Sequence, residues 1–218
     1  MHAHISQQLG NYRMIRLLGR GSFSEVYLGE HISLHNLVAI KVLYTRLVAD
    51  NQESFLRETH TLAALRHPHI VRILESGVEG NSPFLVMDYI SDSTLRQRFP
   101  RGIRVPSADV LPYVKQISAA LQYAHDQKLI HRNVKPENML LDPNNNVLLT
   151  DFGIALISQS SLAQNMQEMA GTVAYMAPEQ LKGKPCPASD QYALGVVIYE
   201  WLSGDYPFHG SFSEIAHQ

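Results

Sequence analysis

Two polar stretches near the middle of the chain contain the residue types that phosphate chemistry uses. The first is HRNVKPEN (131–138), with Lys135 and Asn138, and the second is TDFGIA, with Asp151. Amide and carboxylate oxygens such as those of Asn138 and Asp151 are ligands that Mg²⁺ prefers. A β-hairpin predicted over residues 139–149 would bring the two stretches together, and Lys135 would then place a positive charge near a phosphate. The spacing therefore predicts a magnesium and phosphate site.

A glycine-rich stretch, GRGSFSEV (19–26), lies between two predicted strands. Gly19 and Gly21 lack a Cβ, so a tight strand–turn–strand here could bring backbone N–H groups close to phosphate oxygens. Ser24 takes the place of a third glycine. Because a hairpin without any ligand could contain the same residues, this stretch alone leaves both interpretations open.

A lysine in the segment VAIK (38–41) is the next candidate. Side chains alternate along a strand, so Ala39 and Lys41 share one face. A strand that covers a nucleotide needs a small residue beside its lysine, although a surface lysine at a strand end would look the same. Glu58 lies on the apolar stripe of a predicted helix, where a carboxylate is costly unless a cation meets it. Lys41 is the expected partner of Glu58.

The hydrophobic pattern predicts the elements that must position these residues in the first half of the chain. Short runs rich in β-branched, leucine and aromatic residues predict strands. These runs are 12–18, 26–30, 37–43, 70–74 and 84–90. One helix from about Asp50 interrupts them, because Phe55, Glu58, Leu62 and Leu65 have helical spacing. The first half is therefore predicted to be a small, largely antiparallel sheet with one helix.

The second half has helical periodicity. Apolar residues at 110, 114, 117, 121 and 124 predict a long amphipathic helix, with Ser107 or Asp109 near its N-cap. Residues 189–204 are apolar on almost all sides and end in glycine, which predicts a buried helix.

Together these motifs resemble, in the same order, those of eukaryotic-type protein kinase domains. GRGSFSEV resembles the glycine loop, VAIK the lysine motif, HRNVKPEN the catalytic loop, DFG the metal-binding motif and APE (177–179) the end of the activation segment. The similarity runs from Tyr12 to the last residue. It is greatest to the catalytic domains of bacterial Ser/Thr kinases.

The resemblance implies an α+β fold with two lobes, a small antiparallel-sheet N-lobe with one helix and a mainly helical C-lobe. Residues 1–11 would be an N-terminal extension, residues 12–90 the N-lobe and hinge, and residues 91–218 a partial C-lobe. We expect the last C-lobe helices to be missing. Glu179 would then lack the arginine that usually pairs with it, and exposed apolar surface would lower the solubility of the 218-residue chain.

The resemblance also implies a reaction, the transfer of the γ-phosphate of ATP, with Mg²⁺, to Ser or Thr of protein substrates. The implied catalytic residues are Asn133, Lys135, Asn138, Lys41, Glu58 and Asp151, of which Asn138 and Asp151 would hold the metal. The implied ATP-binding residues are Gly19, Gly21, Ser24, Val26, Ala39, Lys41, Met87, Asp88, Ile90 and Leu140. Leu62, Ile73, His131 and Phe152 would form a stack typical of the active arrangement, and Asp190 would hold the catalytic-loop backbone.

Residues 154–176 correspond to the activation segment of the family. Ser158, Ser160 and Ser161 are candidate phosphorylation sites, because Arg132 could pair with an added phosphate. A solvated serine-rich loop is the alternative interpretation. Thr172 is expected to be structural, in the loop that faces the substrate, and its phosphorylation is the alternative.

One residue of the catalytic loop departs from the family pattern. The family has an aspartate at the position of Asn133, where it accepts the proton of the substrate hydroxyl. Asparagine keeps the shape and one acceptor oxygen but loses the charge and the basicity. We therefore expect a kinase of impaired activity. The alternative is a pseudokinase, an ATP-binding scaffold that regulates a partner.

The bulk charge of the chain does not identify a partner. With 18 basic and 20 acidic residues and a net charge of −2, the chain has no electrostatic signature of nucleic-acid or anionic-lipid binding. Its single cysteine, Cys186, fits a reducing compartment, and no window of about 18 apolar residues predicts a membrane span. We therefore expect a cytoplasmic catalytic domain. A membrane anchor beyond residue 218 and a dimer of kinase chains are left open.

Overall fold

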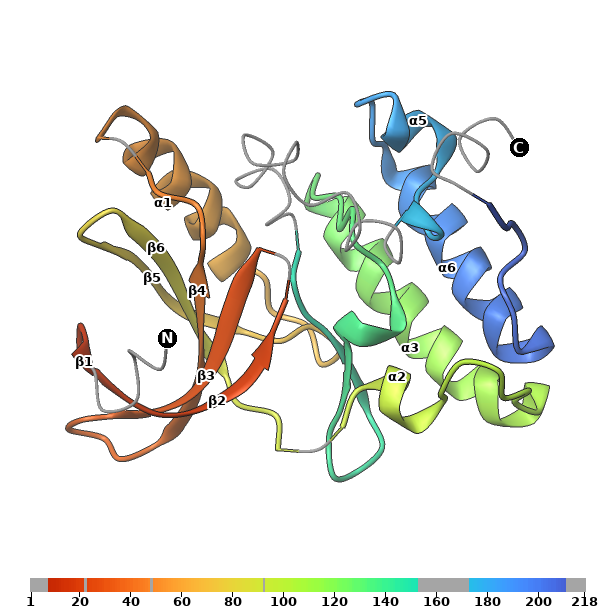
Figure 1. Ribbon diagram of the computed structural model, residues 1–218, viewed down its shortest axis with the longest axis horizontal. Helices are drawn as coiled ribbons and strands as arrows, with labels where there is room; N and C mark the ends of the chain where they lie inside the picture. The colour runs from red at the N-terminus through yellow and green to blue at the C-terminus, as the bar shows by residue number, and fades with distance from the viewer. Residues whose placement is uncertain (1–7, 22, 48, 92, 153–172, 211–218) are drawn as a thin grey trace. The chain divides into compact units, whose positions relative to one another are not determined.

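The computed structural model describes residues 8–210 except 22, 48, 92 and 153–172, and these residues divide into two compact units (Figure 1). The first unit contains the described residues up to Arg66 together with Val71–Ile90. The second contains His67–Ile70 and the described residues from Ser91 onward. The short segment His67–Ile70 therefore leaves the sheet part of the chain and belongs to the helical part.

The first unit is an antiparallel sheet with one helix. Its strands are β1 (Gln8–Leu9), β2 (Tyr12–Arg20), β3 (Ser24–His31), β4 (Leu37–Leu43), β5 (Ile73–Glu79) and β6 (Ser82–Asp88). The order across the sheet is β1-β2-β3-β4-β6-β5, and each neighbouring pair is antiparallel. The antiparallel sheet predicted for this half of the chain is confirmed.

The two faces of this sheet have different roles, because side chains alternate along each strand. One face carries an apolar core, whose buried members are Leu9, Tyr12, Met14, Tyr27, Val38, Ile40, Phe84 and Val86. Gly29 also lies in this region, and a Cβ added there would come within 2.3 Å of Ile40 Cδ1. The glycine is therefore required by the packing of the core itself.

The helix of the first unit, α1 (Ala49–Ala63), differs from its prediction in the face that it buries. Phe55, Thr59 and Leu62 are buried, whereas Glu58 is exposed. Thr59 can point inward because its hydroxyl donates to the Phe55 carbonyl (3.0 Å) and lies 2.8 Å from Ser76 Oγ on β5. Since consecutive helical residues point about 100° apart, burying Thr59 turns Glu58 toward solvent. The prediction of an inward Glu58 was wrong for this structure.

One predicted strand was placed too early in the sequence. The run 70–74 was expected to form a strand, but β5 covers Ile73–Glu79. Ile70 instead forms an isolated parallel bridge with Leu149 of the second unit, to which it belongs. Ile70 and Val71 are buried although they lie outside β5, so the apolar pattern did not reveal where the strand begins.

The second unit is mainly helical. Its elements are α2 (Leu95–Arg98), α3 (Ser107–Asp126), the short 3₁₀ helix η1 (Pro136–Asn138), β7 (Met139–Leu141), β8 (Val147–Leu149), α5 (Pro178–Leu181) and α6 (Pro187–Ser203). The antiparallel hairpin of β7 and β8 confirms the predicted one. Helix α3 begins at Ser107 after the N-cap residue Pro106, so Ser107 and Asp109 lie inside the helix and do not cap it.

Helix α6 is the buried helix that the sequence predicts. Its buried residues are Ser189, Asp190, Ala193, Leu194, Val196, Val197, Glu200 and Trp201. It ends at Gly204, whose φ of 84° is the left-handed conformation that favours glycine after a helix. At its start, the Cys186 N–H donates to Ser189 Oγ (3.1 Å), which gives the cysteine a capping role.

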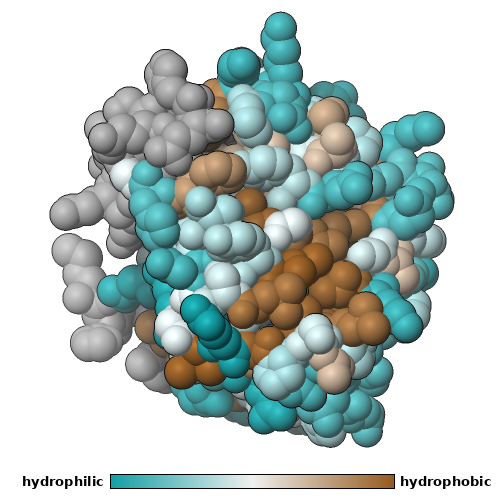
Figure 2. All heavy atoms as spheres, turned by 90° about the vertical axis from the view of Figure 1, so that its right-hand side faces the viewer, coloured by the Kyte–Doolittle hydropathy of each residue, from teal (hydrophilic) through white to brown (hydrophobic). Residues whose placement is uncertain are grey.

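A band of hydrophobic residues crosses the surface shown in Figure 2. In the second unit, the large hydrophobic residues that are exposed are Ile103, Leu111, Tyr199 and Leu202. The apolar surface that missing C-lobe helices would leave exposed stays a prediction. Among the helices of the described part of the chain, none is both long and apolar enough to cross a membrane.

Candidate functional site

The predicted phosphate-binding glycines lie where β2 turns into β3: Gly19 is near the end of β2 and pairs with Val26, and Gly21 follows the strand. The Gly21 N–H donates to the Ser24 carbonyl (2.8 Å), which closes the turn. A Cβ added at Gly19 would meet no atom within 4 Å, and at Gly21 the nearest atom would be 3.8 Å away. Neither glycine has a positive φ. In contrast to Gly29, neither the packing nor the backbone conformation of the described chain requires glycine at positions 19 and 21. A ligand that approaches the backbone closely would explain why glycine is present there.

The predicted adenine and phosphate contacts in the sheet share one face. In register, Lys41 of β4 pairs with Val26 and Leu85, and Ala39 pairs with Leu28 and Met87. The relative exposure of Lys41 is 6% and that of Ala39 is 7%. The strand thus presents a buried lysine beside a small residue, as the alternation of the sequence predicts.

The predicted hinge begins where β6 ends. The Asp88 N–H donates to the Arg72 carbonyl (3.0 Å), and Arg72 Nη2 donates to the Asp88 carboxylate (3.3 Å). Within the described part of the chain, the Ile90 N–H has no hydrogen-bond acceptor. Of the two predicted adenine contacts, Ile90 therefore offers an available donor.

Glu58 does not join Lys41 in this structure. Neither an ion pair nor a hydrogen bond connects the Glu58 side chain to any other residue that the structure describes, because this side chain faces solvent. The predicted pair is thus missing from the first unit, although both residues are described.

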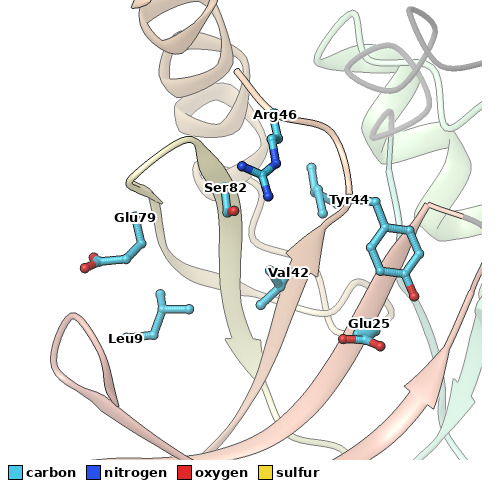
Figure 3. A pocket seen from close by; sticks show the side chains of 8 residues that line it. Leu9, Glu25, Val42, Tyr44, Arg46, Glu79 and Ser82 are labelled. Atoms are coloured by element: carbon cyan, nitrogen blue, oxygen red, sulfur yellow. The ribbon is translucent and has the colours of Figure 1, made fainter. Parts of the chain in front are cut away.

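A pocket lies elsewhere on the first unit (Figure 3). Its lining includes the apolar residues Leu9 and Val42 and the charged residues Arg46 and Glu79. No residue predicted to bind nucleotide lines it, so the pocket is separate from the candidate site.

Asp190 of α6 fixes the backbone of the predicted catalytic loop. Its carboxylate accepts hydrogen bonds from the N–H groups of His131 (2.8 Å) and Arg132 (2.7 Å) and from His125 Nε2 (2.8 Å). Asp190 is only 1% exposed, so its charge is balanced by these donors and not by water. The prediction that Asp190 holds this loop agrees with the observed contacts.

Arg132 adopts an unusual backbone conformation within this loop. Its φ of 67° lies in the left-handed region, which is uncommon for a residue other than glycine. Besides the bond to Asp190, its carbonyl accepts from Gln180 Nε2 of α5 (2.6 Å). Two elements distant in sequence therefore hold the strained residue that precedes Asn133.

The two predicted metal ligands lie on segments that are bonded to one another. Asn138 Nδ2 donates to the Asn133 carbonyl (2.8 Å), and the Thr150 N–H donates to the Asn138 carbonyl (3.0 Å). Thr150 directly precedes Asp151, whose φ of 69° is also left-handed. The hairpin of β7 and β8 thus brings the two loops together as predicted.

Asn133 has an unsatisfied acceptor. Its Oδ1 is buried and has no hydrogen-bond partner among the residues that the structure describes. Buried polar atoms are nearly always hydrogen-bonded in folded proteins, so this atom requires an explanation, such as a bound group that donates to it.

His131 packs against Phe152, with a centroid separation of 4.3 Å. It is fully buried, and burial lowers its pKa below 6.5 despite the neighbouring carboxylates of Asp190 and Asp151. His131 and Phe152 belong to the second unit, and Leu62 and Ile73, the other members of the predicted stack, belong to the first.

Several predicted positions fall outside the described residues. They are Gly153, Ser158, Ser160, Ser161 and Thr172. Leu140 and Lys135 are described and half-buried in the second unit.

Glu179 is not left without a partner, contrary to the prediction. Its Oε1 accepts from Ser189 Oγ (2.5 Å), and this hydrogen bond lowers its pKa. Ser189 lies in the first turn of α6, so a local hydroxyl satisfies this carboxylate.

Sequence reasoning missed a cluster around Arg96. Arg96 of α2 donates to Glu137 of the predicted catalytic loop and to Glu200 of α6, and Tyr175 donates to the same Glu200. Glu200 lies on the helix that was predicted to be buried on all sides. A buried glutamate needs a cation, so its position was a signal that such a partner exists.

Comparisons with known proteins extend this description. A family model for the protein kinase domain matches residues 12–218. The serine/threonine-protein kinase PrkC of Bacillus subtilis is 37% identical over 204 residues, which are 92% of this chain and 32% of PrkC. PknB of Mycobacterium leprae is 38% identical over 215 residues, 95% of this chain and 34% of PknB. The chain thus spans about a third of the length of these curated relatives.

A solved structure is also similar. The chain matches a variant of the PknI kinase domain of Mycobacterium tuberculosis with a TM-score of 0.77 and 31% identity. The match covers 96% of this chain and 80% of the solved one.

We predict that Asp190→Ala destabilises the fold by about 3 kcal/mol, because it leaves buried N–H donors without an acceptor. Urea denaturation measures the loss. Asp109→Asn, an exposed carboxylate on α3, is the control and should change the free energy of unfolding by less than about 0.5 kcal/mol. An equal effect of the two variants would contradict the role of Asp190.

We also predict that the free energy of unfolding falls as the pH drops below about 6.5. The pKa of His131 is lowered in the folded state, so the unfolded chain binds more protons in this range and is favoured. His131 contributes a slope of at most about 1.4 kcal/mol per pH unit. Denaturation of the wild type and of His131→Phe at pH 7.5, 6.0 and 5.0 measures it. Parallel pH profiles for the two proteins would refute the prediction.

Proposed function

The chain belongs to the protein kinase domain family, and from this premise we propose that it transfers the γ-phosphate of ATP, with Mg²⁺, to Ser or Thr of protein substrates. The predicted kinase-like fold, with an antiparallel-sheet part and a helical part, is confirmed by the similar solved kinase domain. Because the chain spans about a third of its curated relatives, the activity and substrates of the whole protein belong to this proposal.

The observation that carries the proposal is the way in which the catalytic loop is held. Asp190 fixes its beginning through two backbone N–H groups, and Thr150 fixes its end through the Asn138 carbonyl. Phosphoryl transfer depends mostly on positioning and electrostatic stabilisation, so a loop fixed at both ends meets its main requirement.

The residues present fit a magnesium site. Asn138 donates through its Nδ2 to the Asn133 carbonyl, which orients the amide, and its Oδ1 accepts from no residue in the described part of the chain. This oxygen and the Asp151 carboxylate are the donor set that Mg²⁺ prefers. When bound there, Mg²⁺ would neutralise the charge that develops on the phosphate oxygens.

The first unit supplies the residues proposed for nucleotide binding. The glycine turn leaves space above Gly19 and Gly21, and Lys41 lies buried beside Ala39 on one face of the sheet. We assign the phosphates to the turn and to Lys41, and the adenine to the hinge, where the Ile90 N–H can donate.

Asn133 has a restricted role in this proposal. Its buried Oδ1 can accept a hydrogen bond from a substrate hydroxyl and orient it, which would satisfy an acceptor that has no donor in the described part of the chain. It cannot take the proton at neutral pH. General base catalysis contributes roughly 10²–10⁴ in rate, and the lower part of this range applies where positioning dominates.

The second candidate function is an ATP-binding pseudokinase that regulates a partner. Two observations favour it: the carboxylate of the catalytic loop is replaced by Asn133, and Glu58 faces solvent without contacting Lys41. Protein kinases need the lysine–glutamate pair for activity. As a kinase, this protein must therefore rotate α1 until Glu58 faces inward.

Comparing Asn133→Asp with the wild type, and with Asp151→Ala as the inactive reference, tests the two candidates. We expect the wild type to transfer phosphate from labelled ATP faster than Asp151→Ala, and Asn133→Asp to be roughly 10²-fold faster than the wild type. If Asn133→Asp remains at the level of Asp151→Ala, the kinase proposal is wrong. If the wild type already exceeds Asp151→Ala, the pseudokinase alternative is wrong.

Nucleotide binding is tested separately by the rise in Tm that MgATP causes. We expect Gly19→Ala to keep the stability of the ligand-free protein within about 1 kcal/mol but to bind ATP roughly tenfold more weakly, because a Cβ would fill the space above the turn. Lys41→Ala should lose the rise in Tm.

Gly29→Ala is the matched control for Gly19→Ala. It should lower the Tm, because its Cβ would meet Ile40, while the folded protein keeps its affinity for ATP. Unchanged ATP affinity in Gly19→Ala would show that the glycine turn does not bind the nucleotide.

We propose protein substrates and a cytoplasmic place of action as the finer part of this function. The single cysteine of the chain supports a reducing compartment. A dimer of kinase chains stays a prediction.

A further inference from the structure

A buried ion cluster joins three elements of the second unit that are distant in sequence. Arg96 Nε donates to Glu137 Oε1 (2.8 Å), Nη1 donates to Glu200 Oε1 (2.7 Å) and Nη2 donates to the Tyr175 hydroxyl (2.5 Å). The Tyr175 hydroxyl in turn donates to Glu200 Oε2 (2.5 Å). One guanidinium of α2 thus binds η1, α6 and the segment just before α5.

The cluster is largely removed from water. The side chain of Glu200 is 3% exposed and that of Arg96 is 16% exposed. Tyr175 is buried, and burial together with its bond to Glu200 raises its pKa, so the hydroxyl keeps its proton. Arg101 also lies near both acids, 3.8 Å from Glu137 Oε1 and 3.9 Å from Glu200 Oε1. Arg96 makes the shorter contacts, 2.8 Å and 2.7 Å, and its low exposure restricts its geometry more than that of an exposed ion pair.

The place of Glu137 gives the cluster a connection to the reaction. Glu137 lies in η1 directly before Asn138. The Asn138 carbonyl accepts a hydrogen bond from the N–H of Thr150, the residue before Asp151. Tyr175 lies two residues before Ala177, the N-cap residue of α5, and α5 supplies Gln180, whose Nε2 donates to the carbonyl of Arg132. Arg96 therefore holds both the end of the catalytic loop and the segment that leads to the support of its beginning.

We propose that Arg96 is a positioning residue, which sets the catalytic loop through Glu137 and the 173–177 segment through Tyr175 by means of the shared partner Glu200. This inference rests on the proposed kinase function. Arginine suits the role because its planar fork can donate to three acceptors at once, whereas a lysine ammonium has a single centre.

The chain offers a matched control on the same short helix. Arg98 of α2 is exposed, and its side chain makes no hydrogen bond or ion pair with any residue within the described ranges. Arg98→Met therefore repeats the chemistry of Arg96→Met without touching the cluster. The test uses the full-length protein and measures kcat, KM for ATP, Tm and amide hydrogen exchange of residues 131–141 and 173–181.

We expect Arg96→Met to lower kcat roughly 10- to 100-fold while KM for ATP stays within about twofold, because positioning is lost and the nucleotide site is not. Exchange in both segments should become faster. Arg96→Lys should recover part of kcat, and Arg98→Met should match the wild type in all four measurements.

A double variant separates positioning from folding. Arg96→Met with Glu200→Met replaces the buried charges by apolar side chains and should recover the Tm that the single variant loses. If the double variant also recovers kcat and slow exchange, the cluster only stabilises the fold and the inference is wrong.

The remaining outcomes distinguish this inference from the kinase proposal. If the wild type transfers phosphate and Arg96→Met equals Arg98→Met in kcat and exchange, the inference fails and the proposed function stands. If the wild type transfers no phosphate, the proposed function fails, and amide exchange alone then tests the inference. Faster exchange in Arg96→Met but not in the double variant or in Arg98→Met refutes positioning. Faster exchange in both Arg96→Met and the double variant supports it.

Discussion

The carboxylate of Asp190 is the interaction on which the candidate site depends. It is almost completely buried and accepts from two consecutive backbone N–H groups and from His125. A buried charge is stable only where donors converge on it, so the loop cannot relax without leaving the charge unsatisfied. The left-handed conformation of Arg132 is a consequence, since the energy that it requires must come from such contacts.

The glutamates of the second unit follow the same rule with different partners. Glu200 is satisfied by Arg96 and Tyr175, and Glu179 by Ser189. Glu200 of α6 is bonded to α2 and to Tyr175, and Glu179 of α5 is bonded to α6, so each acid connects separate segments of the unit. The polar groups of this unit therefore define one arrangement of the loops, while the apolar residues of α3 and α6 supply the burial that stabilises it.

Two features separate this chain from a kinase domain in its active arrangement. Asn133 lacks the basicity of an aspartate, and Glu58 faces away from the sheet. They differ in kind, because the first is fixed by the covalent structure and the second is a conformation that rotation of α1 can change. A ligand that stabilises the inward position of Glu58 would change the conformation of α1 but could not restore the basicity that Asn133 lacks.

The sequence by itself determined the sheet, the long helices, the hairpin of β7 and β8 and the resemblance that pointed to the family, because these depend on local periodicity and on short motifs. The role of Asp190 was implied only by the resemblance to the kinase family; its physical reason is that a carboxylate on an otherwise apolar helix must meet donors. Only the tertiary structure decided the start of β5, the outward turn of Glu58 and the partners of Glu179 and Arg96. These depend on which distant segments meet. Thr59 could displace Glu58 from the buried face because its hydroxyl lies 2.8 Å from Ser76 Oγ, 17 residues away, and no local pattern contains that contact.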